Sequence, residues 1–438
     1  MEEARNRIFC SAGKDGHRKK WKRGAFFLWL CLAMGGLSAC RPGGQGSAAE
    51  VRAEAVDVAM GTVVRQTVYL GNTQTHLENA GSGNSDPPES SDGNKDSDPK
   101  ETGDRSADSD PRQTAEEIVA EVLEIITELE TRTLSRRLPT AEVYRLNAEA
   151  ANAKATDAEA ANAAPVRESG ADTVSVSHEM VSVEVSEALA AVLEETFRMS
   201  ERSGGALDVT IGELTRLWGL DLETAERKSD YRPPTESQVE KALEHCGFSK
   251  VAADGNRVTL PRHMSLDLGA VGKGIAADEV AAYLKNRQEV AGAVVSIGGT
   301  ILTYGEKPDQ SPWKVGIVHP RSTGEYLGWL TLRGEWYVST SGDYERYAEA
   351  DGVRYHHLLD PKDGYPADSG VVSVTILCKN GLLSDSLSTA CFVLGVENGL
   401  RLARECQAQA LIVDTEGELH MTEGMEGLFS GRTSKNSE

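Results

Sequence analysis

The sequence predicts a mixed α+β fold, and two observations indicate it. Runs rich in β-branched and apolar residues, typical of strands, alternate irregularly with stretches of helical periodicity. This order favours α+β over a doubly wound sheet, which needs a regular strand–helix alternation. The chain also has 438 residues, enough for a large single domain or two lobes with a sizeable buried core.

The N-terminus combines a basic region, an apolar run and a cysteine. The basic residues 18–23 precede the apolar run 25–34, which is short for a bilayer span but suits the core of a signal peptide. Residues 37–40 resemble a bacterial lipobox that ends in Cys40. We expect residues 1–39 to be a lipoprotein signal peptide, Cys40 to be lipidated and residues 40–50 to form a tether. The protein is then exported and anchored on the extracytoplasmic side of a bacterial membrane; an uncleaved signal anchor is the alternative.

Residues 51–436 are expected to form the globular domain, with two interruptions. A strand is predicted at 63–70, where β-branched residues gather. The acidic stretch 71–113 is rich in Asp, Ser, Gly, Asn and Pro, so it cannot bury enough apolar surface to order, and we expect it to be disordered. The second insert, 148–170, is rich in Ala, Asn and Glu and is expected to be a loose helix or a linker.

Apolar periodicity predicts helices in the rest of the domain, at 116–134, 186–203, 275–286, 384–394 and 397–406. Gly204 and Gly205 are a plausible C-cap for the second of them, and a further helix is expected after Pro233-Pro234-Thr235. Strands and turns are expected within 251–304 and 313–340, and 410–414 as the final buried strand.

Charge and cysteine content narrow the function classes. The net charge is −22, which disfavours general nucleic-acid binding because phosphate backbones require a cationic surface. No CxxC pair occurs, so a cysteine-based metal site is not indicated. Cys246, Cys378, Cys391 and Cys406 are widely spaced, and we interpret them as structural.

Asp385 and Thr389 are four residues apart in a predicted helix. Residues i and i+4 share a helix face, so a carboxylate and a hydroxyl point the same way. Hard oxygen ligands of this kind suit Mg²⁺. The alternative is an ordinary helix-start cap.

A glycine-rich turn at 265–274 carries Lys273. Glycine allows close backbone approach, a helix N-terminus attracts anions, and lysine adds a positive charge for a phosphate. The pattern is neither a P-loop nor the dinucleotide GxGxxG. The alternative is a tight strand–helix turn with a surface lysine.

Two adjacent histidines, His356 and His357, precede a turn built from Asp360-Pro361 and Gly364-Tyr365-Pro366. In an extended segment one histidine points inward and the other outward. Histidine transfers protons near neutral pH, and structural packing is the alternative role.

Taken together and in this order, these motifs resemble the ApbE-type FAD:protein FMN transferase family. The resemblance runs from residue 58 to residue 429, apart from the two inserts. It is carried by the segments 60–62, 135–147, 203–210, 218–219, 267–274, 296–299, 312–316 and 340–344, by the His-His…Asp-Pro turn, and by Asp385 with Ser388 and Thr389.

The resemblance implies a two-lobed α+β fold with a flavin dinucleotide cleft between the lobes. It implies that Asp385, Thr389 and the backbone carbonyl of Ala270 hold Mg²⁺. The residues it implies for the FAD site are Met60, Arg137, Ala206, Leu207, Asp208, Asp267, Lys273 and Leu359. Three positions depart from the family pattern: Arg137 stands where an aromatic residue is common, Leu207 replaces a common Phe, and Asp363 replaces a common Thr.

The reaction that the resemblance implies is in-line phosphoryl transfer from FAD. A Thr or Ser hydroxyl of an acceptor attacks the FMN phosphorus and AMP leaves. Our own choice of general base is His357, with Asp360 orienting it. The expected acceptors are subunits of membrane redox complexes or exported flavoproteins. Two alternatives stay open: an FAD pyrophosphatase that yields FMN and AMP, and a flavin-binding lipoprotein without turnover.

Overall fold

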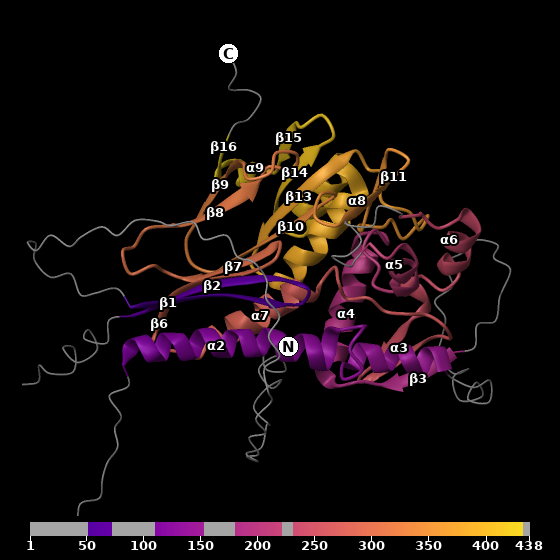
Figure 1. Ribbon diagram of the computed structural model, residues 1–438, viewed down its shortest axis with the longest axis horizontal. Coiled ribbons are helices and arrows are strands. Elements are labelled where there is room, and N and C mark those ends of the chain that lie inside the picture. Colours follow the sequence, from indigo (N-terminus) through magenta and orange to yellow (C-terminus); the bar gives the residue numbers. More distant parts are fainter. Residues whose placement is uncertain (1–50, 72–109, 153–179, 221–230, 432–438) are drawn as a thin grey trace, which may run out of the picture. The chain divides into compact units, whose positions relative to one another are not determined.

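An antiparallel sheet forms the centre of the fold, and within the described residues it has eight strands in the order β1-β2-β6-β7-β10-β13-β14-β15 (Figure 1). This computed structural model describes residues 51–71, 110–152, 180–220 and 231–431. The strands of this sheet are β1 (Arg52–Ala59), β2 (Thr62–Leu70), β6 (Val290–Ile297), β7 (Thr300–Gly305), β10 (Trp336–Gly342), β13 (Val371–Cys378), β14 (Gln409–Asp414) and β15 (Leu419–Met421).

Tight turns join consecutive strands at one end of this sheet. Met60 and Gly61, both with positive φ (53° and 64°), join β1 to β2. Two-residue turns of this sign match the right-handed twist of the strands they connect. Gly298, with φ 57°, begins the equivalent turn between β6 and β7. An added Cβ on Gly298 would lie 2.5 Å from Thr62 Oγ1, so the two turns are in close contact.

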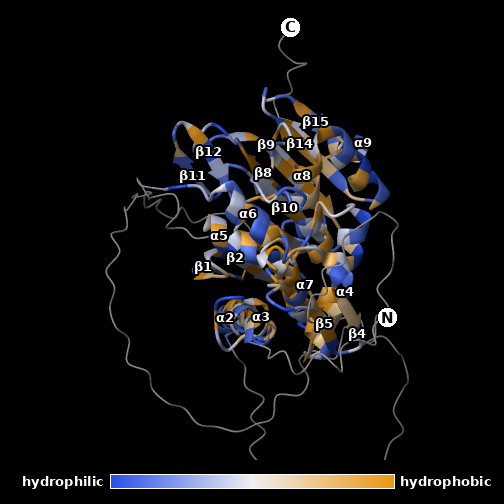
Figure 2. Ribbon diagram, turned by 90° about the vertical axis from the view of Figure 1, so that its right-hand side faces the viewer, coloured by the Kyte–Doolittle hydropathy of each residue, from blue (hydrophilic) through white to orange (hydrophobic). Residues whose placement is uncertain are grey.

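Helices cover one face of the sheet. They are α2 (Pro111–Leu129), α7 (Gly272–Lys285) and α8 (Gly381–Glu405). Side chains of alternate strand residues, such as Val64 and Val68 of β2, form one apolar cluster with these helices. Figure 2 shows α2 nearly end-on beside β1 and β2.

A small sheet covers part of the other face. Its strands are β8 (Trp313–Val318), β9 (Tyr326–Leu332) and β16 (Phe429–Gly431), in the order β16-β9-β8. Trp313 and Leu330 of this sheet pack against Tyr69 and Val338 of the large sheet in a second apolar cluster. The large sheet is thus covered on both faces over most of its width.

The remaining elements form a smaller part of the fold. They are α3 (Glu142–Asn152), β3 (Met180–Glu184), α4 (Glu187–Arg202), α5 (Gly212–Trp218), α6 (Glu236–Leu243), a 3₁₀ turn (Phe248–Lys250), β4 (Ala252–Asp254) and β5 (Arg257–Pro261). Strands β3, β5 and β4 form a sheet of their own. The hairpin β11 (Tyr347–Ala350) and β12 (Val353–His356), and the short helix α9 (Glu423–Glu426), complete the described elements.

The α+β prediction is confirmed, while several predicted boundaries differ. Helix α2 begins at Pro111, capped by the Asp110 side chain, so the end of the expected insert 71–113 is helical. It ends at Leu129 and continues as a π-helical turn, Glu130–Leu134. Helix α3 likewise extends into the expected insert 148–170.

Two predictions near the C-terminus are confirmed. The helices expected at 384–394 and 397–406 are the two parts of α8, separated by the non-helical Gly395 (φ 80°, ψ −179°). The strand expected at 410–414 is β14, the last strand with buried side chains in the described part of the chain; β15 and β16, which follow it, were not predicted. Both are short three-residue strands, too brief for a periodic signal.

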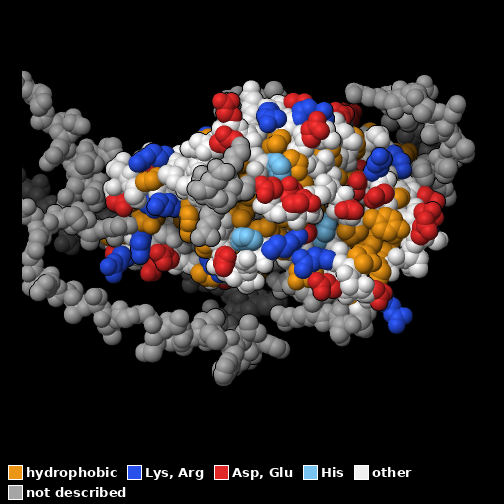
Figure 3. All heavy atoms as spheres, turned by 90° about the horizontal axis from the view of Figure 1, so that it is seen from above, with side chains coloured by type: hydrophobic (Ala, Val, Ile, Leu, Met, Phe, Trp, Pro, Cys, Tyr) orange, Lys and Arg blue, Asp and Glu red, His pale blue; other side chains and the backbone are white. Residues whose placement is uncertain are grey.

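The predicted signal peptide, Cys40 and the tether lie outside the described residues, as do 72–109 and 153–170 of the two inserts. Among the residues that are described, no helix is long and apolar enough to cross a bilayer. On the face shown in Figure 3, acidic and basic side chains are interspersed, as expected of a solvated surface.

Candidate active site

A pocket of about 240 Å³ opens where the β1–β2 turn meets the glycine-rich turn before α7. Both the large sheet and the smaller part of the fold contribute to its walls. It is lined by all eight residues implied for the FAD site: Met60, Arg137, Ala206, Leu207, Asp208, Asp267, Lys273 and Leu359. Ala270, Thr389 and His357 also line it.

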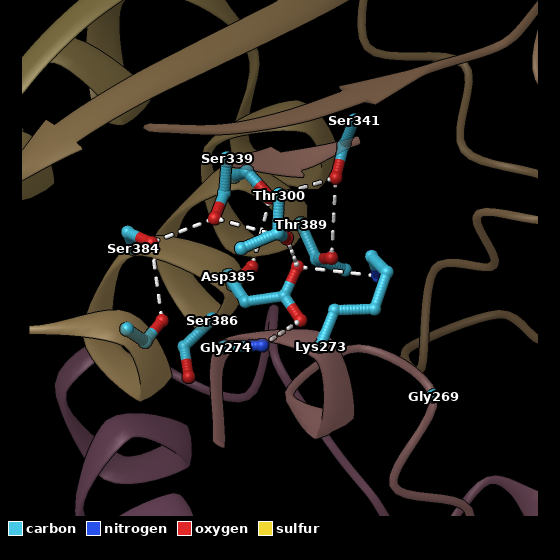
Figure 4. A network of polar contacts seen from close by, with 12 residues as sticks. Gly269, Lys273, Gly274, Thr300, Ser339, Ser341, Ser384, Asp385, Ser386 and Thr389 are labelled. Atoms are coloured by element: carbon cyan, nitrogen blue, oxygen red, sulfur yellow. Dashed lines mark hydrogen bonds and ion pairs between the residues drawn. The ribbon is translucent and has the colours of Figure 1, made fainter. Parts of the chain in front are cut away.

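Asp385, in α8, lies behind the pocket wall to which Lys273 belongs, and it contacts residues of α7 and β7 (Figure 4). Its Oδ1 is 3.3 Å from Lys273 Nζ, and its Oδ2 accepts a hydrogen bond from the Gly274 backbone nitrogen at 3.0 Å. Thr300 Oγ1 donates to Oδ1 at 3.3 Å. The Asp385 side chain is 3% exposed, whereas that of Lys273 is 25% exposed. The ammonium group of Lys273 is therefore held by Asp385, while the Lys273 side chain still lines the pocket.

Glycine makes this arrangement possible where α7 meets α8. A Cβ on Gly274 would lie 2.1 Å from the carbonyl oxygen of Gly381 and 2.8 Å from Cβ of Asp385. A Cβ on Gly381 would lie 2.2 Å from the carbonyl oxygen of Gly274. The two helix starts touch backbone to backbone, and this brings the Gly274 amide to the Asp385 carboxylate.

Buried hydroxyls fix the start of α8 against β7 and β10. Ser339 Oγ lies 2.6 Å from Ser384 Oγ and 3.3 Å from Thr300 Oγ1. Ser341 Oγ lies 2.8 Å from Ser388 Oγ and 3.5 Å from Thr389 Oγ1. Satisfied buried hydroxyls rigidify their surroundings, so these contacts hold Asp385 and Thr389 in place. The quoted motifs included Ser341, Ser388 and Thr389, whereas sequence reasoning missed Thr300, Ser339 and Ser384.

The donor set suits Mg²⁺. Ala270 and Thr389 line the pocket, and the buried Asp385 carboxylate lies behind them beside Lys273, so hard oxygens of three residues gather on this side of the pocket. Among the described residues no cluster of three His, Cys, Asp or Glu side chains could form an all-protein cage. Mg²⁺ in phosphate sites is commonly held by one or two carboxylates together with substrate phosphates, which is the arrangement these residues fit.

The glycine-rich turn is held by Asp267. Its Oδ1 accepts from the Gly269 backbone nitrogen at 2.9 Å, and its Oδ2 forms an ion pair with Arg136 Nε at 2.9 Å. Both side chains are about 15% exposed (15% and 14%). Arg136 also lines the pocket and was not predicted. Its neighbour Arg137 lines the pocket as well, and the Arg137 backbone nitrogen donates to Ser135 Oγ at 3.2 Å.

Met60 lines the pocket from the β1–β2 turn, where its backbone is in the left-handed region. Its φ is 53°, and its backbone nitrogen donates to Glu130 Oε2 at 2.7 Å. The Met60 Cε atom lies 3.3 Å from the position a Cβ on Gly272 would take. Glu130 also lines the pocket and is a second residue that sequence reasoning missed.

The structure gives Asp208 a structural role. Its Oδ1 accepts from both the backbone nitrogen and the hydroxyl of Thr210, at 2.8 and 2.7 Å, and its Oδ2 accepts from the Phe248 backbone nitrogen at 2.9 Å. Burial raises the pKa of the Asp208 carboxyl, and these hydrogen bonds oppose that rise. These hydrogen bonds fix the pocket wall at 206–210, and Asp208 itself lines the pocket.

The two histidines take opposite directions, as predicted. His356 is buried: its Nε2 lies 3.2 Å from the Ala367 carbonyl oxygen, and its ring packs edge-on against Phe392. His357 faces the pocket, and its Nδ1 lies 3.2 Å from the Arg346 carbonyl oxygen. A carbonyl only accepts, so Nδ1 carries the proton and Nε2 is left as an acceptor. Burial, reinforced by Arg346 and His356, lowers the pKa of His357 to about 3.

The expectation that Asp360 orients His357 is corrected. Asp360 Oδ1 accepts from the Lys362 backbone nitrogen at 2.9 Å, and Asp360 is not among the pocket-lining residues. Its backbone closes the same turn, since its nitrogen donates to the Tyr365 carbonyl and its carbonyl accepts from the Gly364 nitrogen, each at 2.8 Å. Asp360 stabilises the turn, and the Arg346 carbonyl holds the imidazole instead.

Glu345 and Arg346 are further pocket residues that the sequence did not single out. Arg346 Nη2 donates to the Gly61 carbonyl at 3.0 Å, which ties the β1–β2 turn to the segment that holds His357. Burial raises the pKa of Glu345 to about 7, although Lys273 and Arg346 act in the opposite direction. Both residues directly follow the segment 340–344, which carries part of the family resemblance, and this position in the sequence could have indicated them.

Comparisons with known proteins agree with this geometry. A FAD:protein FMN transferase of Vibrio cholerae is 35% identical over 227 residues, which cover 51% of this chain and 65% of the relative. A FAD:protein FMN transferase of Treponema pallidum is 36% identical over 239 residues, covering 51% of this chain and 64% of the relative. The chain thus spans slightly less than two thirds of the length of these two relatives.

A solved structure and a family profile cover more of the chain. The crystal structure of the ApbE protein from Thermotoga maritima superposes with a TM-score of 0.63 at 26% identity, covering 86% of this chain and 99% of that one. Residues 60–412 match the sequence profile of the ApbE family. That match contains every pocket residue discussed above, and the chain belongs to the ApbE family.

Proposed function

We propose that this protein transfers FMN from FAD to a Thr or Ser hydroxyl of an acceptor protein and releases AMP, in a Mg²⁺-dependent reaction. The observation that carries the proposal is the Asp385–Lys273 pair between α8 and α7, because it holds a charged lysine at the pocket wall that Ala270 and Thr389 also line. A pyrophosphate needs such a combination to offset its charge. The names of the two relatives agree with it.

Lys273 is the residue that binds and orients the pyrophosphate. Asp385 fixes the ammonium group, so Lys273 does not have to be ordered when substrate enters. Mg²⁺, held by Asp385, Thr389 and the Ala270 carbonyl, would supply positive charge at the phosphate oxygens. The bond that breaks joins the FMN phosphorus to the bridging oxygen, which departs with AMP.

His357 is the residue that takes the acceptor's proton. Its Nδ1–H is directed to the Arg346 carbonyl, so Nε2 is the atom available to the attacking hydroxyl. The bond that forms joins that hydroxyl oxygen to the FMN phosphorus. The low pKa of His357 describes the protein without substrate. A bound pyrophosphate adds negative charge beside the ring and raises this pKa, which makes proton uptake easier.

We also propose that the protein is an exported lipoprotein and that its acceptors are exported or membrane redox proteins. The basic region, the apolar run and residues 37–40 support this. Cells labelled with a radioactive fatty acid should label the wild-type chain and leave a Cys40→Ala variant unlabelled. Equal labelling of the two chains would refute lipidation at Cys40.

The transfer is tested with the purified chain, FAD, Mg²⁺ and the soluble domain of a redox-complex subunit that bears a Thr/Ser segment. Intact mass spectrometry follows the acceptor, and chromatography follows FMN and AMP. We expect the acceptor to gain one FMN, and the gain to disappear with Asp385→Ala. Free FMN and AMP with an unmodified acceptor would identify a pyrophosphatase, and bound but intact FAD would identify a flavin carrier.

A further inference from the structure

The β1–β2 hairpin has an apolar surface beside the pocket that is exposed in the described part of the chain. Val58 and Val56 are 70% and 66% exposed, the highest values for large hydrophobic residues in the described part of the chain. Val58 pairs directly with Val63, which is 38% exposed, so the three side chains lie on one face of the hairpin. We call Val56, Val58 and Val63 the valine face.

The opposite face of the hairpin explains why the valine face is uncovered. Ala53 and Ala59 of β1 are buried in the cluster that contains α2, so β1 contributes its small side chains to the core. On the valine side, the sheet of β8, β9 and β16 covers residues such as Tyr69 and Val338 but not these valines. β1 is also an edge strand, so a partner can reach it without displacing another strand.

The exposed aromatic residues, by contrast, have partners within the fold. Tyr326 and Trp329 stack with ring centroids 4.6 Å apart, and their rings cover Gly316. Tyr365 packs on Trp218 at 5.6 Å. In the described part of the chain, Val58 is paired across the hairpin with Val63 and Val56 with Arg65, and exposed apolar surface of this kind marks interaction sites.

The valine face is continuous with the active site. Met60 and Thr62, which flank the tip of the same hairpin, line the pocket. Arg346 holds this tip through the Gly61 carbonyl, and the Arg346 carbonyl holds the imidazole of His357. Arg346 therefore connects the hairpin to the imidazole whose Nε2 is proposed to take the acceptor's proton.

We propose that the valine face is the docking surface for the acceptor protein, which packs apolar side chains on Val56, Val58 and Val63 while its hydroxyl enters the pocket past Met60. This inference rests on the proposed transfer of FMN to a protein, because that reaction requires a polypeptide to contact the pocket rim. FAD and Mg²⁺ do not need this surface. The valine face therefore sets the KM for the acceptor and leaves the KM for FAD unaffected.

The experiment compares Val58→Glu with the wild-type chain, using the same soluble acceptor domain. A carboxylate on the valine face must be desolvated by an apolar partner, so we expect the KM for the acceptor to rise at least about tenfold. FAD affinity and the kcat at saturating acceptor should stay unchanged. Val58→Ile keeps the apolar surface and should retain wild-type kinetics.

Val318→Glu is the matched control. Val318 is 47% exposed on β8, and none of the residues of β8 lines the active-site pocket. It carries the same substitution at another exposed valine, away from the pocket, so we expect its KM for the acceptor to equal that of the wild type. A melting curve of each variant confirms that the fold is intact, as expected for exposed positions.

Each contrary outcome has a separate meaning. If the wild type labels the acceptor and Val58→Glu does so with the same KM, the docking surface is refuted and the transferase stands. If the wild type splits FAD without labelling any acceptor, the proposed function fails and the docking surface fails with it. Loss of binding to phospholipid vesicles, or loss of a dimer in sedimentation, with an unchanged acceptor KM would assign the valine face to a membrane or to a second copy.

Discussion

Lys273 Nζ lies 3.3 Å from Asp385 Oδ1, and this ion pair joins the first turn of α7 to the first turns of α8 at the wall of the pocket. The carboxylate is almost completely buried and the lysine is not. Removing the carboxylate charge would leave Lys273 without its ion-pair partner and the proposed magnesium site without its acidic ligand.

Asp385→Asn tests the charge of this carboxylate while preserving its shape. The amide oxygen can still accept from the Gly274 nitrogen, so we expect a folded protein. The rate of FMN transfer at saturating FAD should fall about 10²–10³-fold, the usual cost of losing one electrostatic contact to the transition state. The Mg²⁺ concentration needed for half-maximal rate should rise. Asp414→Asn, which alters a carboxylate paired with His420 away from the pocket, is the control and should keep its rate.

Gly274→Ala tests the close contact of the two helix starts. The new Cβ would meet the Gly381 carbonyl oxygen at 2.1 Å, so α7 and α8 would have to separate. We expect a loss of at least about 2 kcal/mol in the free energy of unfolding, measured by urea denaturation, as overpacking of backbone contacts costs about 1–3 kcal/mol or more. Gly427→Ala is the control, because the nearest atom to its Cβ is 3.8 Å away and its φ is −75°. Equal stability of the two variants would contradict the close backbone contact between Gly274 and Gly381.

His357→Asn and Asp360→Asn separate the two residues that the sequence assigned to proton transfer. Loss of the imidazole should lower kcat by about 10²–10⁴-fold, the range for a general base. Asparagine at 360 can still accept from the Lys362 nitrogen, so we expect its kcat to stay within about threefold of the wild type, as for exposed polar changes that preserve a turn. Stopped-flow measurement of FMN transfer decides between them, and comparable losses in both variants would restore Asp360 as the orienting group.

Glu345→Gln tests a pH dependence of stability. The pKa of Glu345 in the folded protein is about 7, above its ordinary value of 4.5, because burial disfavours the charged form. Between these values the folded state binds more protons than the unfolded state, so the stability from Glu345 is present below pH 4.5 and is lost as the pH rises through 7. The charged groups that affect it are Lys273, Arg346 and Asp385.

Glutamine stays neutral at every pH. The Tm of Glu345→Gln should therefore exceed that of the wild type increasingly between pH 4.5 and 7, and by a constant amount above. His357, whose pKa is lowered to about 3, has the opposite slope below pH 6.5, but it is common to both proteins and cancels in the difference. Melting curves at pH 4, 6 and 8 measure this difference. A difference that does not vary with pH would show that Glu345 is not buried as described.

Local signals predicted many elements well. Helix α4 begins after Ser186, whose side chain accepts from the Leu189 nitrogen, and Gly204 and Gly205, both with positive φ, follow its end. Gly395 separated two predicted helices and does interrupt α8. Caps and glycine turns act over a few residues, so a single sequence carries them fully.

Contacts between remote residues were not predictable in the same way. Arg136 pairs with Asp267, Glu130 holds the Met60 nitrogen, and Ser339 meets Ser384. Nothing near any of these residues in the chain indicates its partner. Each pair forms because the sheet and helices pack in one particular arrangement, which the periodicity of one segment does not encode.

The sequence by itself determined the α+β class, most helices and strands, and the set of residues that gather around one pocket. Only the tertiary structure decided what several of them do: Asp208 and Asp360 use their carboxylates to fix backbone turns, while Arg346 and Glu345 face the pocket. The physical reason is that side-chain roles depend on burial and on which polar groups lie within hydrogen-bonding distance. Those quantities arise only when segments far apart in the chain pack against one another.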